Sequence, residues 1–433
     1  MQPTAAVSSD ALIPPDITAT IVDPAAYADQ RIHEAYRWLR ANNPMGYARP
    51  EGFEPFWVVT KHGDILDVSR QNALFCSSQK QIILTTEAAD RRMRDLNGGD
   101  HRLLNTLVSM DGPEHLKYRV LTQAWFLPQN LRKIEDRIRL IARKSVEKML
   151  ASGGRCDFVR DVATGFPLHV IMSILGVPEQ DEPRMLMLTQ QIFGPQDPDK
   201  ARKDGEEDDP ARWAEQLRGI FMDFGAYFSN LTEQRRATPA DDIATLLANA
   251  LIDGKPMADR ETMSYYVIVA TAGHDTTSST TAAAMLALCE DKSEFAKLKA
   301  DPTLLPGFIE EAIRWATPVK HFMRCATADA ELRGRKISRG DLLMLCYASG
   351  NRDEEIFEDP FAFRADRKPN KQLAFGYGAH LCLGQHLAKM EMRILYEELL
   401  PRLKSVELDG NATFTKATFV SGPKSLPIRF EAT

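Results

Sequence analysis

Apolar residues recur every three or four positions along most of this chain and alternate with polar residues only in short runs. The first spacing puts apolar side chains on one face of a helix, and the second puts them on one face of a strand. We therefore predict a mainly α fold with minor β structure. The predicted helices cover residues 29–42, 62–71, 111–126, 130–152, 157–175, 181–193, 211–235, 257–290 and 303–316, and the predicted strands lie within residues 55–60, 319–348 and 403–431.

Three segments depart from this pattern. Residues 1–28 are predicted to form an irregular N-terminal lead-in. Residues 77–110 mix apolar runs with turn formers, and a long irregular stretch inside a compact domain is usually functional or mobile. Residues 194–213 are dense in charge, proline and glycine, which is typical of a solvated surface loop. Between the last two segments, Asp111 and Pro113 predict the start of a helix, with Asp111 as its cap.

The longest predicted helix, residues 257–290, is weak in its middle. That middle reads AGHDTTSSTT and combines glycine with threonine and serine, which are all poor helix formers. Local stability gives no reason for this composition. A glycine inside a helix instead lets another group pack close to the backbone, so we predict a close contact there.

A second candidate site is the segment FGYGAHLCLG, which runs from Phe375 to Gly384. Cys382 lies there among three glycines and just before a predicted helix. Glycine lets the backbone approach a flat group closely, and the free amides of a helix N-terminus favour a thiolate that can ligate a metal. On these residues alone, a buried structural cysteine in a glycine-rich turn is the alternative.

This segment resembles the haem-binding loop of the cytochrome P450 family. The matching positions are Phe375, Gly376, Gly378, His380, Cys382 and Gly384. The resemblance extends over nearly the whole chain and implies the family's fold, a large helix-rich domain with a small β-rich region, built by residues 1–433 as a single haem domain. It also implies haem b as the cofactor, Cys382 as the iron ligand, and Phe375, Gly376 and Gly384 beside the haem.

The middle of the long helix resembles the oxygen-binding groove of the same family. Ala272 and Gly273 would lie against the haem, and Asp275 and Thr276 would form the acid–alcohol pair that delivers protons to oxygen. The alternative is that these side chains only bond backbone groups nearby. The haem-loop resemblance favours the catalytic role, whereas for His274 we favour a structural one.

Other charged residues match family positions with a binding or bracing role. Haem propionates are anions and need cations near them, and the resemblance implies four anchors: His115, Arg119, Arg324 and His380. A Glu-x-x-Arg pair, Glu311 and Arg314, would join Arg367 in a buried cluster that braces the structure without taking part in catalysis.

Several stretches are most similar to bacterial family members that hydroxylate alpha-terpineol, namely residues 270–279, 314–324, 382–392 and 397–408. This implies a small, apolar, ring-containing substrate such as a monoterpenoid or an alkylbenzene. In the family, residues 194–213 join two helices over the site, so lid motion is a functional alternative for that loop. The positions expected to contact substrate, each also plausible as plain core, are Ile82, Leu84, Ile268, Thr271, Ala272, Val319, Phe322, Phe419 and Val420.

Composition narrows the cellular setting. The net charge of −6 argues against a nucleic-acid partner. The N-terminal residues show no signal peptide, and no apolar stretch approaches the roughly 18 residues of a membrane span, so no membrane partner is expected. Six scattered cysteines without CxxC pairs suit a reduced cytosol, and we predict a cytoplasmic protein.

The family implies a monooxygenase that uses O2 and electrons from a separate iron–sulfur ferredoxin. The ferredoxin would dock near Cys382, where positive charge could come from Arg132, Lys133, Lys389 and Arg393; ordinary surface charge is the alternative for these four residues. A haem-thiolate sensor without turnover and a peroxide-using peroxygenase are the competing functions. The intact acid–alcohol pair favours the monooxygenase, because a sensor needs no proton relay.

Overall fold

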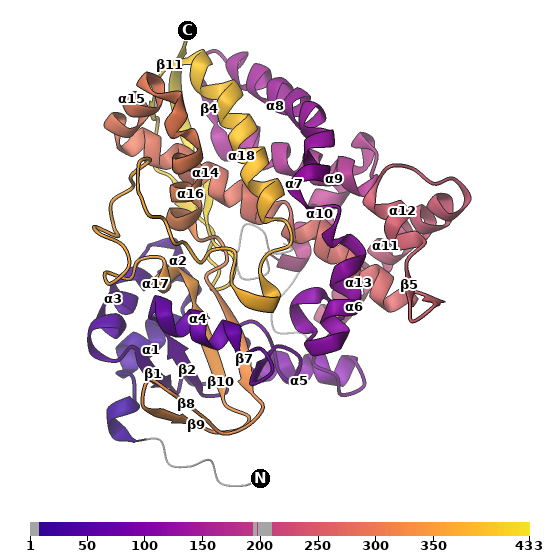
Figure 1. Cartoon of the computed structure of the whole chain (residues 1–433), viewed down its shortest axis with the longest axis vertical. Coiled ribbons are helices and arrows are strands. Elements are labelled where there is room, and N and C mark those ends of the chain that lie inside the picture. Colours follow the sequence, from indigo (N-terminus) through magenta and orange to yellow (C-terminus); the bar gives the residue numbers. More distant parts are fainter. Residues whose placement is uncertain (1–7, 194–196, 198–209) are drawn as a thin grey trace.

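Helices make up most of the structure, which is a computed structural model that describes residues 8–193, 197 and 210–433. The α-helices of this part are α1 (Pro15–Val22), α2 (Pro24–Ala28), α3 (Ile32–Asn42), α4 (His62–Arg70), α5 (Glu87–Leu96), α6 (Gly112–Gln123), α7 (Pro128–Leu131), α8 (Glu135–Leu150), α9 (Gly165–Leu175), α10 (Glu182–Phe193), α11 (Pro210–Ala237), α12 (Ile243–Ala248), α13 (Asp259–Ala272), α14 (Asp275–Glu290), α15 (Lys292–Ala300), α16 (Leu305–Ala316), α17 (Tyr347–Gly350) and α18 (Gln385–Leu399). In Figure 1 the first helices lie at the lower left, and α8, α14, α16 and α18 lie above them.

The strands form one larger sheet and several small ones. They are β1 (Met45–Ala48), β2 (Phe56–Val59), β3 (Phe75–Cys76), β4 (Arg155–Asp157), β5 (Leu251–Ile252), β6 (Lys255–Pro256), β7 (His321–Ala326), β8 (Ala330–Leu332), β9 (Arg335–Ile337), β10 (Leu342–Cys346), β11 (Leu403–Leu408), β12 (Thr413–Phe414), β13 (Pro423–Ser425) and β14 (Pro427–Ala432). The larger sheet has the order β1-β2-β10-β7-β3, and its only parallel pair is β2 with β10. This sheet packs with α1 to α4, as the lower part of Figure 1 shows. The predicted mainly α fold with minor β structure is confirmed.

Helix α14 runs through the middle of the helical region and is buried on nearly all sides. Ala282, Ala283 and Ala284 have small side chains, which let neighbouring helices approach closely, and α14 contacts α9, α16 and α18. The Tyr396 hydroxyl of α18 donates to the Thr281 carbonyl at 2.8 Å. This packing fixes where the N-terminal residues of α14 lie.

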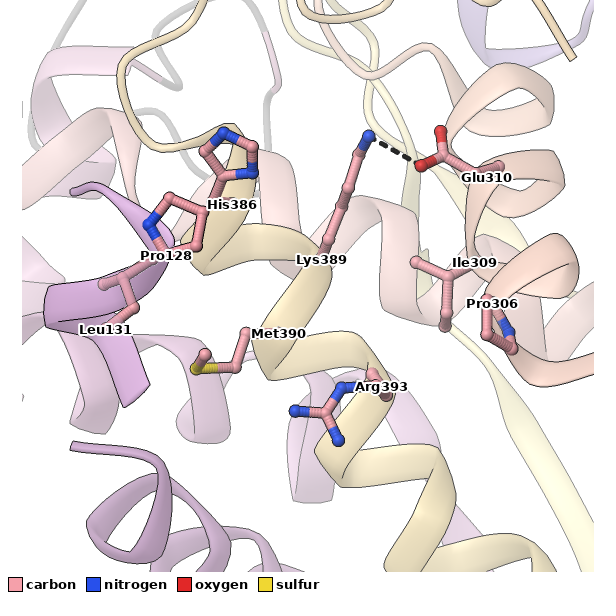
Figure 2. A pocket seen from close by; sticks show the side chains of 9 residues that line it. All are labelled: Pro128, Leu131, Pro306, Ile309, Glu310, His386, Lys389, Met390 and Arg393. Atoms are coloured by element: carbon pink, nitrogen blue, oxygen red, sulfur yellow. Dashed lines mark ion pairs between the residues drawn. The ribbon is translucent and has the colours of Figure 1, made fainter. Parts of the chain in front are cut away.

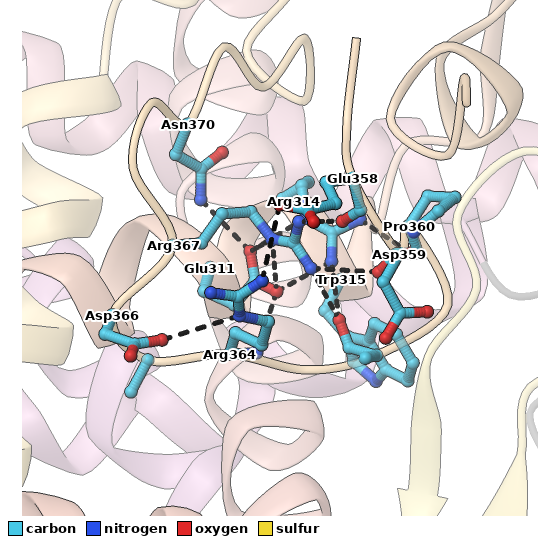
Figure 3. Close-up of polar contacts among 12 residues, drawn as sticks. Glu311, Arg314, Trp315, Glu358, Asp359, Pro360, Arg364, Asp366, Arg367 and Asn370 are labelled. Carbon is cyan, nitrogen blue, oxygen red and sulfur yellow. Dashed lines mark hydrogen bonds and ion pairs between the residues drawn. The ribbon is translucent and has the colours of Figure 1, made fainter. Parts of the chain in front are cut away.

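A buried ion cluster joins α16 to the segment that leads toward Cys382 (Figure 3). Glu311 accepts two bonds of 2.7 Å from Arg314 and bonds of 3.0 Å from Nε of Arg367. Arg314 also donates to the carbonyls of Asn351 and Pro360, at 2.8 and 2.9 Å. Because every charge has a partner, the cluster tolerates burial, and removal of one member would leave an uncompensated charge at a cost of about 3–5 kcal/mol. The structure thus brings together the three residues expected to brace the chain.

The prediction of an irregular lead-in over residues 1–28 is wrong for most of the described part, since α1 and α2 lie there. Pro15 and Pro24 each occupy the first position of a helix. An N–H at that position has no acceptor within the helix, so proline, which lacks the N–H, loses no hydrogen bond there. Tyr27 is buried, and its hydroxyl donates to the Ile21 carbonyl at 3.0 Å. The N-terminal helices are therefore part of the core beneath the larger sheet.

The single helix predicted over residues 257–290 is divided in the structure. Helix α13 ends at Ala272 and α14 begins at Asp275, with Gly273 and His274 between them. The Thr276 hydroxyl donates to the Ala272 carbonyl at 3.0 Å. In a continuous helix this carbonyl would accept from the backbone amide four residues later, and here a side chain bonds it. The poor helix formers at this place therefore mark a break.

Two further expectations concern long connections. Residues 77–110 are irregular except for short turns and for α5, which the sequence pattern did not predict. The loop expected over residues 194–213 lies outside the described residues, apart from residue 197 and the start of α11. Within the described part, no helix is both long and apolar enough to cross a membrane.

Candidate active site

Glycines shape the loop that carries Cys382. Gly376 and Gly378 have φ of +70° and +74°, which residues with a side chain rarely adopt. A Cβ on Gly378 would lie 2.4 Å from the Ser69 carbonyl oxygen, so the end of α4 packs directly on the loop. The Cys382 N–H donates to the Phe375 carbonyl at 2.9 Å and closes the loop. This geometry places the sulfur just before the N-terminus of α18.

The surroundings of the Cys382 sulfur combine burial with hydrogen-bond donors. Burial raises the pKa of the thiol, while the backbone amides of Gly384 and Gln385 and the charge of Arg119 act in the opposite direction. Arg119 also donates to the Leu381 carbonyl at 2.8 Å, which holds it beside the loop. Amides at a helix N-terminus favour a thiolate, and a thiolate is the form that ligates iron. A Cβ on Gly384 would meet no protein atom within 4 Å, so the space there is open.

The four basic residues expected to hold an anionic group lie together. The rings of His115 and His380 are 4.6 Å apart. Burial is the main cause that lowers the pKa of His380, and the charges of Arg324 and Arg119 lower it further. The four basic residues are therefore close enough to act on one another electrostatically. Burial and its basic neighbours also lower the pKa of His115 to about 4. Among the described residues, the buried Nε2 of His115 has no hydrogen-bond partner, which suits an anionic oxygen of a ligand.

Asp111 organises this cluster in a way that the sequence prediction missed. It occupies the cap position of α6, but its side chain makes no cap bond, so its expected role as a cap is wrong. Its carboxylate instead accepts from the amides of Ser77 and Ser78, at 2.8 and 2.7 Å, and lies 3.6 Å from Nε2 of His380. Asp111 is thus the acidic neighbour of His380, whose Nε2 also lies 3.4 Å from the Ser77 hydroxyl.

The break between α13 and α14 holds the expected acid–alcohol pair. The Asp275 carboxylate has 21% of its side chain exposed and lies 3.4 Å from Nδ1 of His274, which is fully buried. Ala272, the last residue of α13, is exposed, although most residues of α13 and α14 are buried. A Cβ on Gly273 would lie 2.8 Å from the Ile171 side chain on α9, and the expected contact of Gly273 with a cofactor stays a prediction. Its lack of a side chain serves helix packing.

Comparison with known proteins decides the family. The sequence profile described as Cytochrome P450 matches residues 80–428. The chain belongs to the cytochrome P450 family. It is similar to cytochrome P450-terp of a Pseudomonas species, with 47% identity over 97% of this chain and 98% of the relative. A steroid C26-monooxygenase of Mycolicibacterium smegmatis is 32% identical over 96% of each chain. The crystal structure of CYP108D1 from Novosphingobium aromaticivorans matches with a TM-score of 0.90 and 43% identity, over 98% of this chain and all of that one.

This P450 is a monooxygenase, and its family carries a haem with a thiolate ligand. The residues present fit that group. Cys382 would supply the thiolate, and the open space at Gly384 and the positive φ of Gly376 would let the flat ring approach the loop. Nε2 of His115, which has no hydrogen-bond partner among the described residues, and the guanidinium of Arg119 would face the propionates.

The residues expected to contact substrate fall into three groups. Phe322 and Phe419 lie together with ring centroids 5.3 Å apart, and Val319 pairs with Val420 in an isolated bridge, so these four gather in one place. Leu84, in contrast, packs in the core beneath the larger sheet, which favours a structural role for it. Ile268 and Thr271 lie on α13, and the carbonyl of Ile82 accepts from the Met323 amide of β7 at 2.8 Å.

His321 of β7 bonds the segments around Leu84 and Thr418, and the sequence analysis did not predict this role. Its Nε2 accepts from the Leu84 amide at 3.0 Å, and its Nδ1 therefore carries the proton and donates to the Thr418 carbonyl at 3.1 Å. The neutral ring also packs edge-on against Phe419. Burial lowers the pKa of His321 to about 4. One uncharged imidazole thus fixes three segments around the apolar cluster.

A shallow surface pocket lies where α7, α16 and the start of α18 meet (Figure 2). Lys389 reaches across it and pairs with Glu310 at 2.6 Å, and Arg393 pairs with Glu135 at 2.8 Å. Two of the four cations expected to attract a ferredoxin are therefore partly neutralised. Arg132 is exposed just beyond α7, as is its neighbour Lys133. Docking of a ferredoxin on this face stays a prediction.

We expect the fold to lose stability when His321 is protonated. The ring takes up a proton near pH 6.5 in the unfolded chain but only near pH 4 in the folded one, so the unfolded state binds more protons between these values. Above pH 6.5 the neutral His321 ring adds its full share, about 3 kcal/mol, to the free energy of unfolding. This share is lost as the pH falls from 6.5 to 4. Denaturant unfolding across this range measures it.

His321→Gln is the matched variant, because an amide can still accept from Leu84 and donate to Thr418 but does not titrate. It should unfold with a flatter pH dependence than the wild type between pH 4 and 6.5. His386→Gln, at an exposed position on α18, should leave the wild-type profile unchanged. Identical profiles for His321→Gln and the wild type would show that His321 does not titrate in this way.

Proposed function

We propose that this P450 hydroxylates a small apolar ring compound, a monoterpenoid or an alkylbenzene, with Cys382 as the iron ligand. The observation that supports it most directly is the setting of one thiol. Cys382 stands before α18 with two backbone amides on its sulfur and with Arg119 beside it. His115, Arg324 and His380 lie next to the same loop and complete a cluster of two arginines and two histidines. A thiolate ligand and propionate anchors are what a haem requires of a protein.

When bound, the haem activates O2 so that one oxygen atom enters a C–H bond of the substrate and the other leaves as water. The balance of this reaction requires two electrons and two protons. We assign proton delivery to Asp275 and Thr276. Asp275 is partly exposed and can exchange protons with solvent, and the Thr276 hydroxyl can turn from the Ala272 carbonyl to a neighbouring acceptor. His274, fully buried beside Asp275, would position that carboxylate.

We infer that a separate iron–sulfur ferredoxin supplies the electrons. The pocket between α7, α16 and α18 supports this placement because α18 begins three residues after Cys382. Its rim combines apolar side chains such as Ile309 and Met390 with the charged pair Lys389 and Glu310. A transient partner is held by such a mixture of a small apolar patch and surrounding charges.

The substrate class rests on the relatives and on the apolar cluster. The relative at 47% identity is named P450-terp, whereas the steroid C26-monooxygenase is only 32% identical. Phe322 and Phe419 offer apolar faces, and Val319 and Val420 adjoin them. Such walls select a ligand mainly by shape and by burial of apolar surface, at about 25 cal/mol per Å². Compact rings of about ten carbons fit this chemistry, and charged ligands would lose hydration without gaining a partner.

We expect Thr276→Ala to bind substrate normally but to divert electrons from product to hydrogen peroxide, because the hydroxyl that holds the proton near oxygen is gone. Asp275→Asn should slow turnover by roughly 100- to 10,000-fold, since the amide cannot relay a proton. Product, hydrogen peroxide and reductant consumed are measured together.

Thr280→Ala is the matched control for this prediction. Thr280 lies one turn further along α14, and its hydroxyl donates to the Thr276 carbonyl at 2.8 Å. It has the same chemistry but lies away from the helix break. Normal coupling in Thr276→Ala together with normal rates in Asp275→Asn would remove both residues from proton delivery.

We expect monoterpenoids and alkylbenzenes such as para-cymene to shift the ferric protein to high spin, with a blue shift of the Soret band. The physical reason is that an apolar ligand of this size displaces water from the iron. Long-chain fatty acids and steroids should give no such shift. Titrations followed by absorbance give the affinities for the whole panel.

Turnover assays separate the electron sources. Product should form with a ferredoxin, its reductase and NADH, and the rate should fall to background when the ferredoxin is left out. Equal product formation from hydrogen peroxide alone would indicate a peroxygenase. A spin shift with a steroid and none with any terpenoid or alkylbenzene would contradict the substrate class and leave the haem assignment intact.

A further inference from the structure

Two of the six cysteines, Cys76 and Cys325, stand directly opposite each other in the larger sheet. Strands β3 and β7 run antiparallel, and their register pairs Cys76 with Cys325. Side chains at paired positions project to the same face, with Cα atoms roughly 4.5–5.5 Å apart. A disulfide joins Cα atoms roughly 4.4–6.8 Å apart. The backbone therefore already has the spacing that a disulfide needs.

The Cys76 sulfur lies in a setting that favours its anion. The contact with the Cys325 thiol lowers the pKa of Cys76, and the backbone amides of Gln79 and Ser78 lower it further. The same contact raises the pKa of Cys325, whose sulfur also donates to Oε1 of Gln79 at 3.7 Å. All six cysteines lie within the described residues, and only at Cys76 is the pKa below its ordinary value. A thiolate beside a second thiol is the arrangement of redox-active pairs.

The position of β3 gives small oxidants access to this pair. β3 has two residues and is the edge strand of the sheet, next to β7. Cys76 is 5% exposed and Cys325 is 2% exposed. Few backbone hydrogen bonds hold so short an edge strand, so it opens locally at a lower free energy than the central strands. Oxidation of Cys76 therefore does not require global unfolding.

We propose that Cys76 and Cys325 form a reversible disulfide, with Cys76 as the attacking thiolate and Cys325 as the resolving thiol. The proposal goes beyond the monooxygenase activity and does not depend on it. The oxidant is a small two-electron oxidant, either hydrogen peroxide or a low-molecular-weight disulfide such as oxidised glutathione.

With hydrogen peroxide, the Cys76 sulfur attacks one oxygen, an S–O bond forms, the O–O bond breaks, and the departing hydroxide takes a proton to become water. The Cys325 sulfur then attacks the Cys76 sulfur, an S–S bond forms, the S–O bond breaks, and a second water leaves with the Cys325 proton. Two thiols are oxidised by two electrons in total, and one peroxide is reduced to two waters. With oxidised glutathione, the same two displacements release two molecules of reduced glutathione.

The disulfide would join two strands that both border the cluster of Arg119, Arg324, His115 and His380. Ser77 follows Cys76 directly, and its amide holds Asp111, the partner of His380. Arg324 precedes Cys325 on β7. Oxidation of the pair would therefore lock the edge strand to β7 beside the residues that we assign to the propionates.

The experiment equilibrates the ferric holoenzyme in buffers of increasing oxidised-to-reduced glutathione ratio, without oxygen, followed by acid quenching, alkylation and peptide mass spectrometry. We expect a single linked peptide pair, Cys76 with Cys325, that grows with the ratio and disappears after reduction, with a loss of 2 Da from the intact chain. A stoichiometric dose of hydrogen peroxide should give the same linked pair.

Cys346→Ser is the matched control, because Cys346 is a buried cysteine on β10, the neighbour of β7. It should form the Cys76–Cys325 link as the wild type does. Cys325→Ser should instead leave Cys76 as a mixed disulfide with glutathione. Full alkylation of both cysteines across the series, a stable glutathione adduct in the wild type, or a link from Cys76 to another cysteine would each overturn the proposal.

Discussion

The proposed role of Cys382 as the iron ligand sets the central physical constraint on this protein, because that role requires one sulfur to be held as an anion inside the fold. Burial raises the pKa of Cys382, and the structure opposes that shift with two backbone amides at the start of α18 and with the Arg119 guanidinium. Amides can point at the sulfur only if the loop turns sharply, which the positive φ of Gly376 and Gly378 allows. The shape of residues 375–384 thus follows from the charge that the loop has to carry.

The rest of the scaffold keeps this loop in place. Arg314 bonds the Asn351 carbonyl, and Asn351 in turn bonds the Thr317 hydroxyl and accepts from the Leu373 amide at 2.6 Å. A continuous hydrogen-bonded path therefore runs from the buried Glu311 cluster to two residues before Phe375. On the other side, α4 packs on Gly378 through the Ser69 carbonyl. Rigid support on both sides suits a site whose chemistry depends on the position of a single ligand atom.

The parts that could be predicted from the sequence are those encoded by local spacing. Residue spacing predicted most of the helices and the shared helix face of Glu311 and Arg314, whereas the loop around Cys382 and the place of Arg367 in the Glu311 cluster were implied by the resemblance to the family. Contacts between distant segments could not be predicted in this way. Gly273 faces Ile171, about one hundred positions earlier, and local composition gave no sign of that neighbour.

Polar side chains with a long-range partner were the hardest to place. Asp111 stands where a helix cap belongs, yet its carboxylate serves Ser77, Ser78 and His380. His321 sits in an apolar strand, and only the fold shows that its two nitrogens bond Leu84 and Thr418. Both residues satisfy backbone groups of another segment, a demand that arises only once the chain has folded.

The most direct test of this account is the spectrum of the reduced protein with carbon monoxide. With Cys382 as the iron ligand, the wild type should show the red-shifted Soret band of thiolate ligation, and Cys382→Ser should lose it. Cys156→Ser, which changes a cysteine at the edge of the small β4 sheet, should keep the band. A Cys382→Ser protein that keeps the red-shifted band would show that another residue holds the iron and would contradict the account at its centre.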